Sequence, residues 1–520
     1  MSKILIGNAE IIDGTGASPF CGWVLVEGER IRAVSPSPLQ VEDAEFVDAR
    51  GLTLVPGFID AHAHSDLSLL AAPEAEGKIS QGITSEISGN CGLSAFPIRT
   101  EEVRAHLQEL YKIYGIPLDW NDFQSYTEVL SARKPSINAG FLCGHNTLRA
   151  NILGYENVQG TPGDLEREQR LLREMLEQGA LGLSSGLLYV PGKFASREEM
   201  TGLATVLRKF DRPYTTHLRS EGERLLESVE EALEVAASAG IRLHLSHLKT
   251  AQPRNWHKID ALLKRLAEAR SSGLRVTADR YPYTSGQTSF SVVLPPPCDD
   301  LTDRQIQDLL RSSPEERLRL QQELMRHPRD WRAIILCTTR HPEFSHFGGR
   351  TIQEIADILK RPPEEICMDC LTEDATGAMA AFCGMSEENL DRLLREEFVC
   401  CGTDETARPV SEQLGRSHPR GFGSFPRWIR RSLRLGLPLE RTIQRLTQLP
   451  ATIFSLLERG EIRPGFYADL VLFSRESLID RADFGHPHRL SEGIFSVYVN
   501  GELSFFEKRV CGHAGKILKK

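Results

Sequence analysis

The chain has 520 residues, more than one hydrophobic core usually covers, so the sequence predicts one large domain and a smaller one. Its 62 basic and 71 acidic side chains give a net charge of -9, a balance that argues against binding to nucleic acid or to an anionic membrane surface. No apolar run reaches the ~20 residues of a membrane helix, and the first residues, MSKILIGNAEIIDG, lack the apolar core of a signal peptide. We therefore expect a cytoplasmic protein whose eleven cysteines are reduced thiols.

Both ends of the chain predict short β-strands separated by turns. Near the N-terminus the pattern is seen in KILIGNAEIIDG, WVLVEGERIRAVS and AEFVDARG, and near the C-terminus in IRPGFYADLVLFS and GIFSVYVNGELSFFE. We expect residues 1–54 and 455–515 to form one small β-sandwich domain beside a central domain of residues 55–454.

The central part alternates apolar β segments with helical patterns, which indicates βα units and a parallel sheet. One helix is predicted at 161–179, where Thr161 can cap the first turn and Pro162 occupies the first helical position. Eight β segments predict a closed (β/α)8 barrel of the α/β class. These segments are residues 57–64, 82–90, 137–145, 180–187, 213–218, 241–248, 274–281 and 397–404.

One stretch interrupts this alternation. Between about residues 284 and 331 the chain contains LPPPCDD and a charged helical pattern, PEERLRLQQELMRHPRD. An insertion after the seventh barrel strand lies on the face where barrel enzymes hold their active sites, so we expect it to form a lid. The C-terminal residues GHAGKILKK, 512–520, are expected to be a solvated tail.

The carboxyl ends of the predicted strands carry residues that can bind a metal ion. His62 and His64 end the first strand, and in an extended strand residues at this spacing point to one face. Other strand ends hold Cys91, His217, His247 and Asp404. Neutral imidazoles and a thiolate match zinc, which lowers the pKa of bound water and so supplies hydroxide at neutral pH. Asp404 is the candidate placed to take the proton of that water and to deliver it to a leaving amine.

Other residues of the same types are interpreted as structural. His244 precedes His247 by three residues and is assigned to core packing, whereas His145 ends the third strand without a spacing that makes it a ligand. Cys367 and Cys370 lie in an amphipathic stretch without a second C-x-x-C, so buried helix cysteines are the better interpretation.

The motifs that carry these residues resemble the amidohydrolase superfamily, and within it the N-acyl-D-amino-acid deacylases, or D-aminoacylases. The resemblance covers nearly the whole chain, including GFIDAHAHSD, QGITSEISGNCGLS, GHNTLR, THLRSEGE, SHLK, RYPYTSG, GTDE, HPRGFGSFPR and RGEIRPGFYADLVLF. Most two-metal amidohydrolases bridge their metals with a carboxylated lysine on the fourth strand, but ALGLSSGL has no lysine. SGNCG offers Cys91 instead, which is a mark of the D-aminoacylase branch.

The resemblance implies a role for each of these residues. A tightly bound Zn2+ ion would be held by Cys91, His217 and His247, and a second, weaker metal position would be lined by His62, His64 and Asp404. Asp404 would also be the general acid/base. The substrate α-carboxylate would be bound by Lys249, Tyr281 (with Tyr283 as the alternative) and Arg420, and Tyr189 would line the pocket.

The implied reaction is zinc-dependent hydrolysis of N-acyl-D-amino acids, by metal-bound hydroxide, to a carboxylate and a free D-amino acid. Members specific for N-acyl-D-glutamate carry an arginine early in the insertion, where this chain has SFSVVLPPP, so neutral and preferably apolar D-side chains are expected. The alternatives are a cyclic-amide hydrolase or a D-dipeptidase with the same site, and a non-catalytic scaffold with the amidohydrolase fold. The expected partner is the small-molecule substrate, and the oligomeric state stays open.

Overall fold

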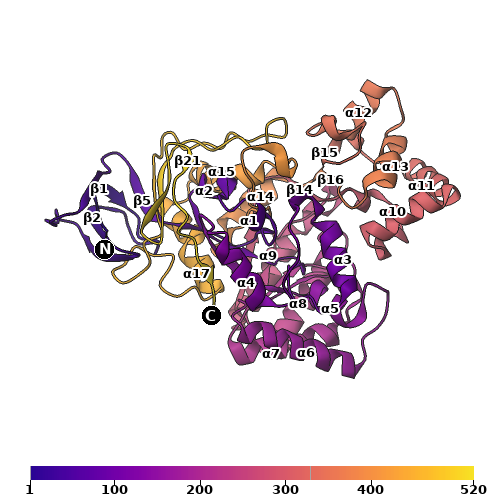
Figure 1. The fold of residues 1–520 in the computed structure, drawn as a ribbon, viewed down its shortest axis with the longest axis horizontal. Coiled ribbons are helices and arrows are strands. Elements are labelled where there is room, and N and C mark those ends of the chain that lie inside the picture. The colour runs from indigo at the N-terminus through magenta and orange to yellow at the C-terminus, as the bar shows by residue number, and fades with distance from the viewer. Residues whose placement is uncertain (1, 328) are drawn as a thin grey trace.

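The computed structural model describes residues 2–327 and 329–520, with a parallel barrel between a β domain and an inserted unit (Figure 1). Each of the eight predicted segments contains a barrel strand. The strands are β6 (Phe58–Asp60), β7 (Ile83–Ser88), β8 (Asn138–Phe141) with β9 (Cys143–Gly144), β10 (Leu183–Gly186), β11 (Tyr214–His217), β12 (Leu243–Leu245), β13 (Val276–Arg280) and β17 (Val399–Cys401). The last strand closes on the first, because the Ala61 amide donates to the Cys401 carbonyl (3.3 Å) and the Asp404 amide to the His62 carbonyl (2.8 Å).

Helices surround the barrel strands. The helix predicted after Thr161 is α6, and Thr161 caps it as expected. The cap is a capping box, since the Thr161 hydroxyl accepts from the Asp164 amide while the Asp164 carboxylate accepts from the Thr161 amide. Outside the inserted unit the helices are α1 (Ser68–Ala71), α2 (Glu76–Ile79), α3 (Glu101–Leu110), α4 (Phe123–Ala132), α5 (His145–Leu153), α6 (Pro162–Glu177), α7 (Arg197–Phe210), α8 (Leu225–Ala239), α9 (Ile259–Ser271), α14 (Glu387–Arg395), α15 (Arg420–Arg434), α16 (Leu439–Leu446) and α17 (Gln448–Ile453). Within the described part of the chain, none of the helices combines the length and apolar character needed to cross a bilayer.

Strands from both ends of the chain share one nine-stranded sheet. The N-terminal β5 pairs antiparallel with the C-terminal β18, so that Val55 lies opposite Val471. The strands are β1 (Lys3–Ile11), β2 (Phe20–Glu27), β3 (Arg30–Ser35), β4 (Glu45–Asp48), β5 (Thr53–Pro56), β18 (Leu470–Phe473), β19 (Ile494–Val499), β20 (Glu502–Phe506) and β21 (Arg509–Val510). Together with the barrel, this sheet gives the predicted fold class, while the domain limits 1–54 with 455–515 and 55–454 stay a prediction.

The segment inserted after β13 is longer than the predicted 284–331. It has a sheet of its own in the order β14-β16-β15, made of β14 (Ser285–Ser289), β15 (Ile334–Thr338) and β16 (Met379–Cys383). Its helices are α10 (Asp303–Ser312), α11 (Pro314–Arg326), α12 (Ile352–Leu359) and α13 (Pro363–Asp374). A separate hydrophobic cluster that includes Phe290, Leu320 and Ile366 holds these elements together. Strand β16 was not predicted from the sequence, because its apolar run, AAFC, is too short to be distinguished from the helical patterns around it.

The cysteines agree with the sequence interpretation. All eleven are free thiols. Cys367 and Cys370 are buried in α13, and Cys400 and Cys401 are buried in β17. Burial raises the pKa of the Cys370 thiol to about 12, as expected for an inert core residue.

The C-terminal residues are not the solvated tail that the sequence predicted. They form β22 (Ile517–Leu518), which pairs parallel with β8 so that Ile517 lies opposite Ala139 and Leu518 opposite Gly140. The Leu518 side chain is buried in the cluster that contains Leu142 and Leu181. This strand was not predicted because Ile517 and Leu518 are the only large apolar residues in GHAGKILKK.

A buried group of ionisable side chains joins α5, α6 and α7. His145 Nε2 lies 2.8 Å from Glu199 Oε1, and Arg149 pairs with the other oxygen of the same carboxylate. Glu168 of α6 faces this group, and within the described chain its Oε1 has no hydrogen-bond partner. Burial and the charge of Glu199 raise the pKa of Glu168 to about 8. We therefore expect Glu168 to hold a proton in the folded protein at neutral pH.

We expect Leu518→Ala to lower the free energy of unfolding by about 2–3 kcal/mol, because it removes a buried leucine from the contact between β22 and the barrel. Urea unfolding followed by tryptophan fluorescence measures this change. Leu457→Ala is the matched control, since Leu457 is 73% exposed and its truncation should change stability by less than about 0.5 kcal/mol. Equal effects of the two substitutions would mean that β22 does not stabilise the barrel.

The pKa of Glu168 gives a pH dependence of stability. Between the unfolded value of about 4.3 and the folded value of about 8, the folded state holds a proton that the unfolded state has lost, so stability falls as pH rises through this window. Glu168→Gln removes this proton uptake. We expect the thermal midpoint of the variant, relative to the wild type, to rise between pH 5 and pH 9. Glu166→Gln, at an exposed position of the same helix, should show no such trend.

Candidate metal centre

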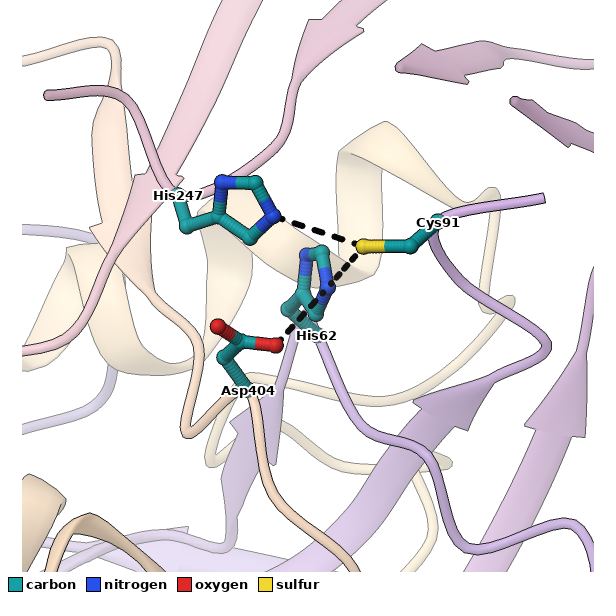
Figure 2. A group of neighbouring side chains, drawn as sticks. All are labelled: His62, Cys91, His247 and Asp404. Carbon is teal, nitrogen blue, oxygen red and sulfur yellow. Dashed lines mark hydrogen bonds and ion pairs between the residues drawn. The ribbon is translucent and has the colours of Figure 1, made fainter. Parts of the chain in front are cut away.

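Four of the predicted ligands meet at the carboxyl ends of the barrel strands (Figure 2). The side chains of His62, Cys91, His247 and Asp404 each offer a ligand atom, and these atoms all lie within 4.8 Å of one another. Cys91 Sγ is 3.3 Å from His62 Nε2 and 3.3 Å from His247 Nε2. His62 Nε2 is 3.6 Å from Asp404 Oδ1. The thiol therefore lies between two imidazoles that come from opposite halves of the barrel.

The remaining two predicted ligands adjoin this group. His64 Nε2 lies 3.0 Å from Asp404 Oδ1. The ring of His217 is centred 4.5 Å from the ring of His247. Both nitrogens of the buried His217 ring have no hydrogen-bond partner in the described part of the chain, which is costly for a buried polar group unless a ligand completes it. All six residues predicted from strand ends are thus brought together.

Neighbouring charges set the protonation of these groups. Burial opposes ionisation of Cys91, yet the charges of His62 and His247 outweigh it and lower the pKa of the thiol well below its usual range. Burial likewise opposes the charge of Asp404, but Arg420, His247 and His64 lower the pKa of this carboxyl. A thiolate, several imidazoles and a carboxylate at this spacing fit zinc, which takes nitrogen, sulfur and oxygen ligands.

Three of the four central residues have left-handed backbone conformations. The φ angle is 52° at Cys91, 35° at His247 and 52° at Asp404. Residues with a Cβ atom rarely adopt this conformation, and where they do the surrounding structure must hold them in it. In each case the residue follows a strand end, so the turn aims the side chain back over the barrel.

Asp279, a buried carboxylate beneath the candidate ligands, was not predicted from the sequence. Its Oδ2 accepts from His62 Nδ1 (3.1 Å) and lies 3.0 Å from His244 Nε2, and its Oδ1 accepts from the His247 amide (2.9 Å). His244 is buried as predicted, but through Asp279 it also supports the site. The sequence does contain a signal for this role, since Asp279 lies within the predicted strand LRVTADRY. A charge buried in a strand requires a partner.

Glu221 was also missed, although it lies in the recognised motif THLRSEGE. Its carboxylate pairs with Lys249 and lies 2.9 Å from His247 Nδ1 and 3.8 Å from His217 Nε2. Burial opposes the charge of Glu221, but Lys249 and these histidines lower the pKa of the carboxyl well below its usual range. Nothing in the sequence separates Glu221 from the exposed Glu223 two residues later.

The residues predicted to bind substrate surround the same centre. Tyr281 is fully buried, and the guanidinium of Arg420 lies over its ring at 4.7 Å. Arg420 Nη1 is 2.8 Å from Asp404 Oδ2. A Cβ atom at Gly286 of the inserted unit would lie 2.9 Å from the Tyr281 hydroxyl, so this strand approaches the tyrosine closely. Tyr189 packs edge-to-face on His217, with ring centroids 4.9 Å apart.

Comparison with known proteins agrees with this geometry. The amidohydrolase family profile matches residues 45–505. The chain is 32% identical to an N-acyl-D-glutamate deacylase and 31% identical to a D-aminoacylase, both from Alcaligenes xylosoxydans xylosoxydans, over 99% of this chain and 96% and 97% of those proteins. The crystal structure of an N-acyl-D-glutamate deacylase from Bordetella bronchiseptica, complexed with zinc and a phosphonate inhibitor, superposes with a TM-score of 0.83 at 30% identity over 99% of each chain.

A crystal structure of a D-aminoacylase superposes with a TM-score of 0.82, also at 30% identity and over 99% of each chain. These full-length relatives and the family profile together confirm the resemblance described from the motifs. The chain belongs to the amidohydrolase family, in the group that contains the D-aminoacylases.

Proposed function

We propose that this protein is a zinc-dependent deacylase that hydrolyses the amide bond of N-acyl-D-amino acids. The observation that carries the proposal is the position of Cys91 Sγ, 3.3 Å from both His62 Nε2 and His247 Nε2, in a barrel whose fourth strand, ALGLSSGL, has no lysine to bridge two metals. Relatives that match along the whole chain and bear the names of N-acyl-D-amino-acid deacylases support it.

Cys91, His217 and His247 are the proposed ligands of the principal zinc ion, and His62, His64 and Asp404 line a second, weaker position. When bound, zinc supplies a Lewis acid for the acyl carbonyl and lowers the pKa of water toward neutrality. The unpartnered nitrogens of His217 support its assignment as a ligand. Asp279 holds the ring of His62 through Nδ1, which leaves Nε2 facing the centre.

Asp404 is the proposed general acid/base. Its lowered pKa keeps the carboxylate ionised and able to accept a proton from the attacking water. The same proton then passes to the amine as the amide bond breaks. His64 and Arg420 contact different oxygens of this carboxylate, so they orient it toward the centre.

Lys249, Tyr281 and Arg420 are the proposed partners of the substrate α-carboxylate, with Tyr189 beside them. Both cations already have anionic partners, since Lys249 pairs with Glu221 and Arg420 with Asp404. A substrate carboxylate would therefore share each cation with a protein carboxylate. This sharing favours a single negative charge on the substrate, because a second one would meet Glu221 and Asp404 without a free cation.

The beginning of the inserted unit supports a preference for neutral D-side chains. From Ser285 to Cys298 the chain has no charged residue. An acidic D-side chain would find no cation on this segment, whereas Val292 presents an exposed apolar side chain.

A substrate screen tests the proposed function. With zinc-replete protein, we expect N-acetyl-D-methionine and N-acetyl-D-leucine to be hydrolysed with a higher kcat/KM than N-acetyl-D-glutamate, and the L-enantiomers to be poor substrates. Zinc content measured on the same sample excludes an empty site as the cause of inactivity. A preference for N-acetyl-D-glutamate would contradict the side-chain assignment, and no turnover of any N-acyl-D-amino acid would contradict the function.

Asp404→Asn tests the acid/base assignment. The amide keeps the size of the side chain but cannot accept the water proton, so kcat should fall by about 10²–10⁴-fold, while the variant stays folded and retains its principal zinc ion. Asp483→Asn, at a half-exposed carboxylate, is the control and should keep wild-type turnover. Near-wild-type turnover by Asp404→Asn would remove Asp404 from the mechanism.

A further inference from the structure

Two groups of opposite hydrogen-bonding character lie beside the same nitrogen of His247. Lys249 Nζ and Glu221 Oε1 are each 2.9 Å from His247 Nδ1. The side chains are 2% exposed for His247, 8% for Lys249 and 15% for Glu221, so little water reaches this nitrogen. The other ring nitrogen, Nε2, faces Cys91 Sγ at 3.3 Å.

The two neighbours favour different forms of the imidazole. A neutral imidazole has one N–H group and one nitrogen with a free lone pair. An ammonium group can only donate, so Lys249 favours the tautomer with a bare Nδ1 and a proton on Nε2. A carboxylate can only accept, so Glu221 favours the tautomer with a proton on Nδ1. Only the second tautomer leaves Nε2 free to bind a metal beside Cys91.

We propose that Glu221 is a positioning residue that holds His247 in its metal-binding tautomer against the influence of Lys249. The carboxylate accepts the Nδ1 proton of His247 and also an ammonium proton of Lys249, so this cation has an acceptor other than the imidazole nitrogen. One carboxylate thus lets a metal ligand and a substrate-binding cation lie next to each other.

The backbone holds Glu221 in place for this role. The Glu221 carbonyl accepts from the Ala251 amide at 2.8 Å, which joins the loop after β11 to the loop after β12. These two loops adjoin His217 and His247, respectively, at the ends of their strands. This hydrogen bond therefore holds the backbone that carries the Glu221 carboxylate near both histidines.

Zinc affinity tests this inference, which rests on the zinc site of the proposed function. We would measure the zinc dissociation constant of the full chain by competition with a chromophoric chelator, for Glu221→Gln and Glu221→Leu. The two new side chains are similar in size, but only glutamine has an oxygen that can accept the Nδ1 proton. We expect Leu to weaken zinc binding by about 10–100-fold. Gln should stay within about threefold of the wild type because its amide oxygen replaces the carboxylate oxygen.

Glu221→Gln loses only the negative charge, whereas Glu221→Leu also loses the hydrogen-bond acceptor, so comparing their zinc affinities distinguishes the two effects. If Gln weakens zinc binding as much as Leu does, Glu221 acts through its negative charge and the inference is wrong. Wild-type affinity in Glu221→Leu would contradict it as well. Glu223→Gln removes an exposed carboxylate two residues away and should leave zinc binding unchanged.

Lys249→Met adds a second test if Glu221→Leu does not fold. Removal of the donating ammonium should leave zinc binding in the otherwise wild-type chain undiminished, because Glu221 still accepts the Nδ1 proton. A loss of zinc affinity in this variant would contradict the inference. Zinc binding needs no substrate, so absent deacylase activity in the wild type would overturn the proposed function without affecting these measurements.

Discussion

Ionic groups buried at the mouth of the barrel impose the strongest constraint on this structure, because an unpaired buried charge costs several kcal/mol. Cys91, Asp279 and Asp404 each face a histidine from another strand end. None of these partners is close in sequence. The site is therefore stable only when the first, second, seventh and eighth strands are all in place.

The same constraint extends one layer below the ligands. Lys78 is fully buried, and its Nζ lies 2.7 Å from Asp60 Oδ2, 2.8 Å from the Thr403 hydroxyl and 2.9 Å from the Glu405 carbonyl. Thr403 and Glu405 flank Asp404 in the chain. Lys78 thus fixes the turn that presents the proposed acid/base.

Strand periodicity was enough to predict the barrel and the strand ends at which the proposed ligands meet, whereas contacts between distant segments were missed. The strand ends at His62 and His247 were visible because apolar runs stop there, and the carboxyl ends of parallel strands meet on one face. Glu221 and Asp279 could not be assigned in this way. Their roles arise from which imidazole nitrogen they face, and no local sequence pattern indicates this. The pairing of β22 with β8 was not predicted either, because two apolar residues are too few to show a periodicity.

The left-handed backbone at Cys91, His247 and Asp404 implies a conflict between function and stability. Each non-glycine residue in this conformation costs of the order of 1–3 kcal/mol, and glycine would relieve that cost. Selection for thermal stability alone would therefore favour glycine at these three positions, whereas the proposed metal centre requires a thiol, an imidazole and a carboxylate there. In directed evolution of this protein, a gain in thermal midpoint would need to be checked against metal content before it is counted as an improvement.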